Sequence, residues 1–184
     1  RERFGGKVIV CTMGPPAAAN ILRQALYMGA DETILLTDRR FAGADTLATS
    51  YALACAARKV GAFDLIICGR QAIDGDTAQV GPQLAEKLDL PQVTYAESVE
   101  WVRKGVIRVR SLIDGGHELV EAPMPLLLTV VASANTPRPV GAKRLMQYKK
   151  AVTRSELAAR YGNRDYEDAN QMAAMFAAAQ RILL

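Results

Sequence analysis

The sequence predicts an α/β fold: a doubly wound, mostly parallel sheet with an antiparallel meander and a helical C-terminal arm. In the first part of the chain, short apolar runs such as Asp64–Cys68 alternate with segments whose apolar residues recur at helical spacing. Parallel strands need a crossover connection, and a helix supplies it. The chain has 184 residues, 50% of them hydrophobic, which suffices for one domain with a sizeable core.

The first elements follow from apolar spacing and from signals at their ends. Pro16 suits a first helical turn, where the missing N–H group of proline leaves no hydrogen bond unmade. Gly29 ends that helix, and a second helix with a broad apolar face begins near Asp45. We therefore expect strands at residues 7–13, 33–37 and 64–68, and helices at residues 16–28 and 45–60.

The second half of the chain changes character. Segments with alternating apolar and polar residues surround the turn-like Lys104-Gly105 and Asp114-Gly115-Gly116, a pattern typical of an antiparallel meander. We expect its strands at residues 93–102, 106–113 and 118–121, a further apolar strand at 125–131, and helices at 155–161 and 165–184. The last helix carries an apolar stripe that either a partner subunit or its own domain must cover; the stripe consists of Met172, Phe176, Ala179 and Leu183.

Composition argues against nucleic-acid and membrane partners. The net charge of +4 is modest, and the basic residues are dispersed except at Lys143-Arg144 and Lys149-Lys150, which we interpret as a solvated helix face. The sequence has neither an apolar run of membrane-spanning length nor a charged-then-apolar start typical of a secretory signal. We therefore expect a cytoplasmic protein without direct membrane insertion.

The chain lacks the usual catalytic constellations. Its one histidine, His117, has no visible partner, which argues against a triad hydrolase. Cys11, Cys55 and Cys68 form no Cys-x-x-Cys pair, which argues against a zinc site or a redox pair. We expect Cys11 and Cys68 to be core residues, as free cysteines often are, and we predict no catalytic residue and no metal site.

The candidate site is the loop between strand 64–68 and the helix that begins near Val80. Ligands bind at the carboxyl ends of strands in open α/β sheets, and unpaired backbone N–H groups at a helix start favour phosphate. Gly69 and Gly75 allow close backbone approach, while Asp74, Asp76 and Thr77 can cap the helix or hydrogen-bond ribose and base. On spacing alone, a nucleotide site and a plain well-capped turn are equally good interpretations.

A resemblance favours the nucleotide site. The sequence Gly-Arg-Gln-Ala-Ile-Asp-Gly-Asp-Thr-Ala-Gln-Val-Gly-Pro at residues 69–82, followed by Leu-Pro-Gln-Val-Thr-Tyr at 90–95, resembles the beta (small) subunit of electron transfer flavoproteins. Chance agreement of several ordered motifs is far rarer than that of one short pattern. The other similar segments, in family order, are residues 10–16, 22–31, 41–50, 135–139 and 143–151.

The resemblance implies a Rossmann-like domain of the adenine nucleotide alpha hydrolase type over residues 1–151 and a C-terminal arm over 152–184 that embraces an alpha subunit. It implies a non-enzymatic electron carrier, a heterodimer that takes electrons from flavin dehydrogenases of the acyl-CoA dehydrogenase type, as in fatty acid oxidation, or from other flavin dehydrogenases. A quinone oxidoreductase or another acceptor receives them. The residues after Ala151 do not match the expected family segment, so no docking residue is assigned.

The resemblance also implies an adenine nucleotide in this subunit, either FAD, as in the electron-bifurcating branch, or AMP with the FAD in the alpha subunit. Gly75 and Ala78 stand where the AMP-type loop favours Asp and Asn, and smaller side chains leave more room, so we favour FAD. The residues expected to contact the nucleotide are Met13, Gly14, Gly69, Gln71, Ala72, Asp74, Gly75, Asp76, Thr77, Ala78, Gln79 and Val80.

Two other classes share this architecture. A stand-alone nucleotide-binding regulator of the universal-stress type would carry a glycine-rich phosphate signature late in the chain, which is absent here. An adenylating enzyme would carry a Ser-Gly-Gly-x-Asp-Ser-like loop where this chain has Thr12–Pro16. The family also begins with an extra strand and helix whose loop closes part of the pocket. Since the sequence starts at Arg1 without them, we expect a fragment or a truncated gene.

Overall fold

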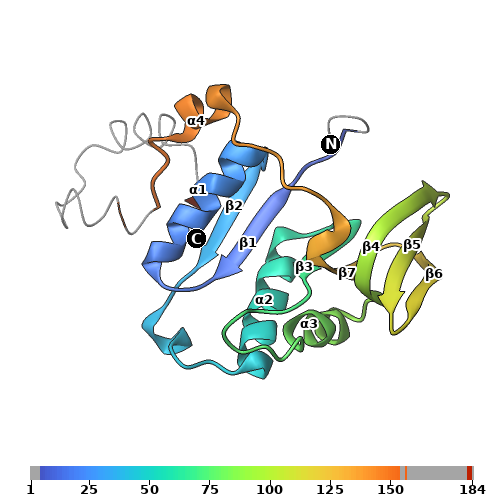
Figure 1. Cartoon of the computed structure of the whole chain (residues 1–184). Helices are drawn as coiled ribbons and strands as arrows, with labels where there is room; N and C mark the ends of the chain where they lie inside the picture. The colour runs from blue at the N-terminus through green and yellow to red at the C-terminus, as the bar shows by residue number, and fades with distance from the viewer. Residues whose placement is uncertain (1–4, 154–155, 157–181, 184) are drawn as a thin grey trace. The chain divides into compact units, whose positions relative to one another are not determined.

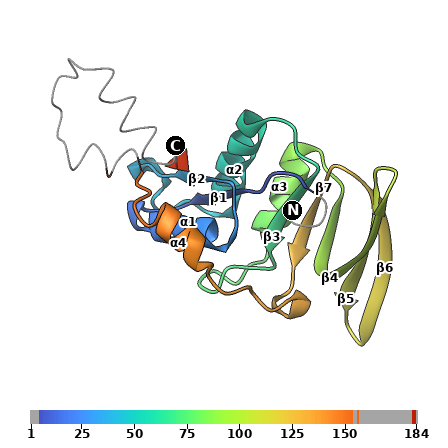
Figure 2. The ribbon, with the colours of Figure 1, turned by 90° about the horizontal axis from the view of Figure 1, so that it is seen from above.

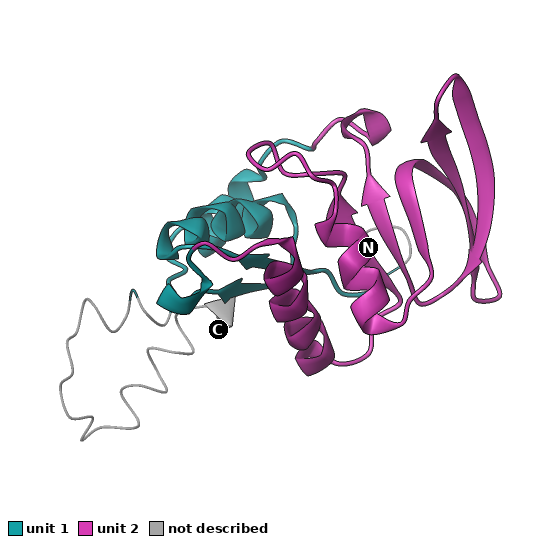
Figure 3. Ribbon diagram, turned by 90° about the horizontal axis from the view of Figure 1, so that it is seen from below, with its two compact units in different colours: residues 1–42, 138–184 teal, residues 43–137 magenta. Residues whose placement is uncertain are grey.

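A computed structural model describes residues 5–153, 156 and 182–183 (Figure 1). The chain divides into two compact units: unit 1 comprises residues 1–42 and 138–184, and unit 2 comprises residues 43–137 (Figure 3). Each unit combines helices with its own hydrogen-bonded sheet, three-stranded in unit 1 and five-stranded in unit 2. The predicted α/β class is confirmed, with the strands paired in two sheets.

In unit 1, a strand–helix–strand repeat forms the core. The first two strands pair in parallel from Ile9 opposite Glu32 to Met13 opposite Leu36, and the intervening helix packs Leu22 against the sheet. That helix ends at Gly29, whose φ of 126° suits glycine. The elements are β1 (Ile9–Met13), η1 (Pro16–Ala18), α1 (Ala19–Met28), β2 (Glu32–Leu36), η2 (Arg39–Phe41), α4 (Ala142–Tyr148) and β8 (Ile182–Leu183).

The segment that returns to unit 1 after residue 137 closes the C-terminal end of α1. Arg144 Nη1 donates to the carbonyl oxygen of Ala30 at 3.0 Å and to that of Leu26 at 3.4 Å. The backbone N–H of Gly141 donates to Tyr27 O at 3.4 Å. A guanidinium at this end also complements the negative end of the helix dipole. The Lys143-Arg144 pair is therefore more than the solvated helix face that we expected.

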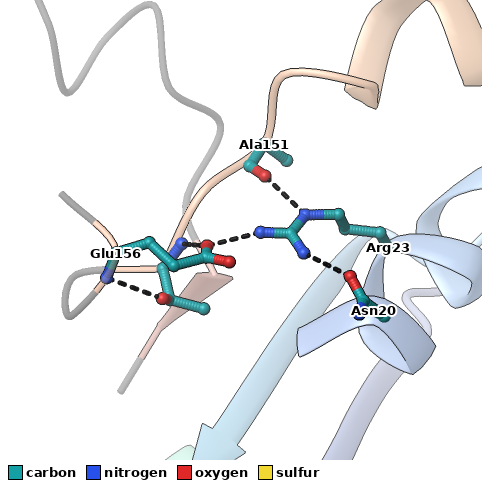
Figure 4. A network of polar contacts seen from close by, with 5 residues as sticks. Asn20, Arg23, Ala151 and Glu156 are labelled. Atoms are coloured by element: carbon teal, nitrogen blue, oxygen red, sulfur yellow. Dashed lines mark hydrogen bonds and ion pairs between the residues drawn. The ribbon is translucent and has the colours of Figure 1, made fainter. Parts of the chain in front are cut away.

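A second arginine fastens the chain beyond α4 (Figure 4). Arg23 Nε donates to Ala151 O at 2.8 Å, Nη1 donates to Asn20 Oδ1 at 2.8 Å, and Nη2 pairs with Glu156. Thr153 and Glu156 bond reciprocally, with Thr153 N donating to Glu156 Oε2 at 2.8 Å and Glu156 N donating to Thr153 Oγ1 at 3.1 Å. This reciprocal arrangement is a capping box.

Unit 2 holds the predicted meander (Figure 2). Its sheet has the order β3-β7-β4-β5-β6, in which β7 runs parallel to β3 and β4 while β4, β5 and β6 are antiparallel. Lys104 (φ 50°) and Gly105 (φ 78°) make the β4–β5 turn. The elements are α2 (Thr46–Val60), β3 (Leu65–Gly69), α3 (Val80–Leu88), β4 (Gln92–Arg103), β5 (Val106–Ile113), β6 (Gly116–Pro123), β7 (Leu126–Val130) and η3 (Ala132–Ala134).

Strand β7 is buried on both of its faces. Leu127 packs against Ala54 of α2 and Leu84 of α3, whereas Leu126 and Leu128 belong to a separate cluster with side chains of β4, β5 and β6. A parallel strand covered on both faces is apolar throughout, which explains the run Leu126–Leu128. Helices α2 and α3 thus lie on the face of the sheet to which Leu127 points.

Most of the predicted C-terminal arm lies outside the described residues, including Met172, Phe176 and Ala179, so the arm and its stripe stay predictions. Ile182 and Leu183 are described, and they pair in parallel with Thr33 and Ile34 of β2. The helix expected to continue to residue 184 is therefore wrong at these two positions, because a short apolar run fits a strand as well as a helix. In the described part of the chain, no helix has the length and apolarity that a membrane crossing requires.

Candidate functional site

The loop predicted as the site joins β3 to α3, and backbone hydrogen bonds hold both of its ends. The backbone N–H of Arg70 donates to Val130 O at 3.0 Å, which extends the pairing of β3 with β7. The backbone N–H of Gln83 donates to Gln79 O at 3.0 Å, which closes the first turn of α3. Between these anchors the loop is largely exposed, and Ile73 is 100% exposed.

Hydrogen bonds within the loop hold it in one shape. Asp76 N donates to Ala72 O at 3.1 Å, Gly75 N donates to Asp74 Oδ1 at 2.9 Å, and the Gln71 amide donates to the carboxylate of Asp76. Asp76 (φ 47°) and Ala78 (φ 54°) lie in the left-handed region, which non-glycine residues adopt infrequently. Residues held in this region cluster at ligand sites, where the surrounding structure sets them.

No side chain caps the start of α3. Of the two roles that we gave Asp74, Asp76 and Thr77, capping of the helix is wrong, because Gln71 bonds to Asp76 and Asp74 accepts from Gly75 instead; hydrogen bonding to ribose or base stays a prediction. Around the start of α3, the backbone N–H groups of Thr77, Ala78, Gln79, Val80 and Gly81 have no hydrogen-bond acceptor among the described residues. The first turn of a helix with unpaired N–H groups carries partial positive charge, which suits an anionic ligand.

The glycines of the motif differ in what surrounds them. A Cβ atom at Gly69 or Gly75 would meet no atom within 4 Å, so open space adjoins the backbone at both positions. A Cβ atom at Gly81 would lie 2.6 Å from Cγ2 of Thr129 on β7, so α3 packs closely on the sheet there. Gly69 and Gly75 leave room for a ligand, whereas Gly81 fixes the helix to its strand.

The sequence reasoning missed a polar cluster beside Gln79. Thr46 Oγ1 donates to Gln79 Oε1 at 2.9 Å, and Gln83 Nε2 donates to Thr46 Oγ1 at 3.3 Å. Ser50, a fully buried residue, lies 3.2 Å from Gln83 Oε1 through its Oγ. The other members of this cluster, Thr46, Ser50 and Gln83, lie on α2 and α3, and helical periodicity alone gives no signal that they meet.

Met13 and Gly14 belong to unit 1, at the carboxyl end of β1, whereas the loop belongs to unit 2. The N–H group of Gly14 already donates to Leu36 O at 3.0 Å, so it offers no free donor. At the end of the neighbouring strand, hydrogen bonds from Arg40 lower the pKa of Asp38 to about 2. That Met13, Gly14 and the loop converge on one nucleotide stays a prediction.

The candidates for other chemistry are poorly placed for it. His117 is exposed, and its Nδ1 lies 4.0 Å from Oε2 of Glu97, which also pairs with Arg110 at 3.1 Å; the expected lack of a partner was wrong. Cys11 is exposed and so is not the core residue that we expected, whereas Cys68 packs below α3 and burial raises its pKa. Among the described residues, no cluster of three or more metal-ligating side chains occurs.

Comparison with known proteins identifies the family. Residues 1–159 match the electron transfer flavoprotein domain. An electron transfer flavoprotein subunit beta of Thermoanaerobacterium thermosaccharolyticum is 57% identical over 138 residues, which cover 75% of this chain and 52% of the relative. The chain spans about half the length of the curated relatives that it matches.

Two further relatives carry other names. The caffeyl-CoA reductase-Etf complex subunit CarD of Acetobacterium woodii is 50% identical over 153 residues, covering 83% of this chain and 58% of the relative. Protein FixA of Azorhizobium caulinodans is 48% identical over 141 residues, which cover 73% of this chain and 50% of the relative. None of these relatives is named as a universal-stress regulator. These matches show that the chain belongs to the electron transfer flavoprotein family and is similar to its beta subunits.

Proposed function

We propose that this chain is the nucleotide-binding part of an electron transfer flavoprotein beta subunit, which acts as an electron carrier together with an alpha subunit. The observation that carries the proposal is the uncapped start of α3, where the N–H groups of Val80 and Gly81 find no partner among the described residues beside the open space at Gly75. A phosphate group fits such donors.

In this proposal the protein binds and orients, and the chemistry belongs to the cofactor. Backbone N–H groups of Thr77, Ala78, Val80 and Gly81 hold the phosphate, and the exposed side chains of the loop contact the ribose and the base. A bound flavin supplies reversible electron transfer. The loop keeps its own shape through the Gln71–Asp76 hydrogen bond, so little reorganisation accompanies binding.

We infer that the nucleotide is FAD and that AMP is the alternative. Gly75 has no side chain and that of Ala78 is small, and a Cβ atom at Gly75 would face open space, which favours the larger ligand. The absorption spectrum of this subunit, purified with its alpha subunit, separates the two. Two flavins per heterodimer support FAD here, whereas one flavin per heterodimer with bound AMP refutes it.

The partners that we propose are an alpha subunit and flavin dehydrogenases, among them enzymes of the acyl-CoA dehydrogenase type. The name of one relative, a subunit of a caffeyl-CoA reductase-Etf complex, supports an enzyme acting on a CoA thioester as one such partner.

The variant Gly75→Val tests where the nucleotide binds. Its side chain meets no protein atom within 4 Å of Cβ, so we expect the free energy of unfolding to change little while nucleotide occupancy falls. Nucleotide released after gel filtration and heat denaturation is quantified by chromatography. Full occupancy in the variant would contradict the proposed location. Gly116→Val, at the start of β6, serves as the control, because its φ is also outside the left-handed region and a Cβ atom there also meets no atom within 4 Å.

A further inference from the structure

Gln79 is held by a chain of hydrogen bonds that reaches into the α2–α3 packing. Gln83 Nε2 donates to Thr46 Oγ1, and Thr46 Oγ1 donates to Gln79 Oε1. Ser50 Oγ lies 3.2 Å from Gln83 Oε1 and 2.9 Å from Leu47 O, so its one proton is shared between these two acceptors. Gln79 is exposed, Thr46 and Gln83 are half-buried, and Ser50 is fully buried. The chain therefore runs from the interior of unit 2 to the predicted nucleotide loop.

The bond from the Gln83 amide sets the direction of the bond that Thr46 makes to Gln79. A hydroxyl group has one proton to donate, so once Thr46 accepts from Gln83 Nε2, its own proton is available for Gln79 Oε1. Thr46 thereby occupies the carbonyl end of the Gln79 side chain. The other end, the Nε2 group with two N–H donors, has no hydrogen-bond partner among the described residues.

We propose that Thr46 and Gln83 are positioning residues that orient the Gln79 amide so that its Nε2 group donates to an anionic oxygen of the bound nucleotide. This inference rests on the proposed nucleotide site and adds residues of α2 to it. The reverse orientation would present Gln79 Oε1 to the ligand and would repel a phosphate oxygen. The relay thus selects a ligand with a hydrogen-bond acceptor at this point.

The bond between Thr46 and Gln79 joins the starts of two helices. Thr46 is the first residue of α2, which Asp45 caps by accepting from Ala48 N at 2.8 Å. Gln79 directly precedes α3. Because the cap fixes the first turn of α2, the Thr46 hydroxyl has a defined position from which to hold Gln79.

The test is Thr46→Val, which removes the hydroxyl and keeps the branched shape. Dissociation constants for AMP and for FAD are measured by calorimetry on the whole chain, and ligand-free stability is measured by urea unfolding. We expect the affinity for the bound nucleotide to fall by about fivefold to tenfold, the size of one neutral hydrogen bond, because the Gln79 amide is no longer held in one orientation. Thr46→Ser should restore affinity to within about twofold, because its hydroxyl can make the same bonds.

Two comparisons separate positioning from general destabilisation. Thr49→Val, a change of the same chemistry further along α2, should leave the affinity unaltered. In a Gln79→Ala background, Thr46→Val should cause no further loss of affinity, because Thr46 acts through Gln79.

The outcomes distinguish the relay from the site itself. If the unaltered chain binds nucleotide and Thr46→Val binds as tightly, the relay is refuted and the site stands. An additive loss in the Gln79→Ala background also refutes the relay. If the unaltered chain binds neither AMP nor FAD, the proposed site and the relay fall together.

Discussion

The close approach of α3 to β7 at Gly81 gives the sharpest prediction. An alanine there would place its Cβ atom 2.6 Å from Cγ2 of Thr129, about 1 Å inside the optimal separation of two carbon atoms. Thr129 cannot turn aside easily, because it is 3% exposed and its Oγ1 accepts from Tyr95 N at 3.1 Å. Helix α3 must therefore move away from the sheet.

The expected magnitude follows from two opposing effects. Overpacking of a close-packed core costs about 1–3 kcal/mol. Replacing glycine by alanine in a helix returns up to about 1 kcal/mol through helix propensity, and less in a first turn such as this one. We expect Gly81→Ala to lower the free energy of unfolding by about 1–2 kcal/mol, which corresponds to a fall in Tm of roughly 2–8 °C for a chain of this size.

Urea unfolding followed by circular dichroism measures this loss, and Thr129→Ser identifies its cause. Serine removes the methyl group that the new Cβ atom meets and keeps the hydroxyl that binds Tyr95. In the Thr129→Ser background, Gly81→Ala should therefore cost less than half as much. Gly75→Ala is the matched control, since its Cβ atom meets open space and stability should change by under about 0.5 kcal/mol. Equal losses from Gly81→Ala in both backgrounds would refute the packing argument.

Three further outcomes are expected. Arg23→Met should lower the free energy of unfolding by about 1–2 kcal/mol in urea titrations, because Ala151 O and Glu156 lose their donor; an unchanged midpoint would show that the network is dispensable. Burial raises the pKa of Glu156, but hydrogen bonds from Arg23 and Thr153 outweigh burial and lower the pKa below its ordinary 4.5. The ionised Glu156 therefore contributes its full stabilisation above pH 4.5, and this stabilisation is lost as the pH falls through the lowered pKa. The stability difference between wild type and Arg23→Met should accordingly shrink in acid, and a constant difference would contradict the ion pair. His117→Ala should leave electron transfer by the assembled complex within about twofold in a dye-reduction assay, whereas an essential histidine would contradict the carrier function.

Local signals predicted the elements well. The helix expected at 45–60 is α2, Thr46–Val60, because Asp45 is the N-cap that its sequence suggests. The turn at Lys104-Gly105 was also predictable, because the residues that make it are adjacent in the chain, and this turn sets the register of β4 and β5.

Contacts between distant residues could not be predicted. Gln83 reaches Thr46 across 37 positions and Arg144 reaches Ala30 across 114, and neither pair leaves a mark on helical periodicity. The loop motif indicated where α3 begins. It did not indicate that Gln71 would hydrogen-bond to the Asp76 carboxylate, so that Asp76 does not cap the helix. Competition between neighbouring polar side chains decided that outcome.

Unit 1 consists of two stretches of chain with all of unit 2 between them, and this has a consequence for the order of folding. As the chain emerges from the ribosome, unit 2 is complete at Pro137. At that point Arg144 has not yet been synthesised, so the carbonyl groups at the end of α1 lack its hydrogen bonds. Domains generally fold as units during synthesis. We therefore expect unit 2 to fold early as a continuous segment and unit 1 to close last, when the segment after Pro137 returns to α1.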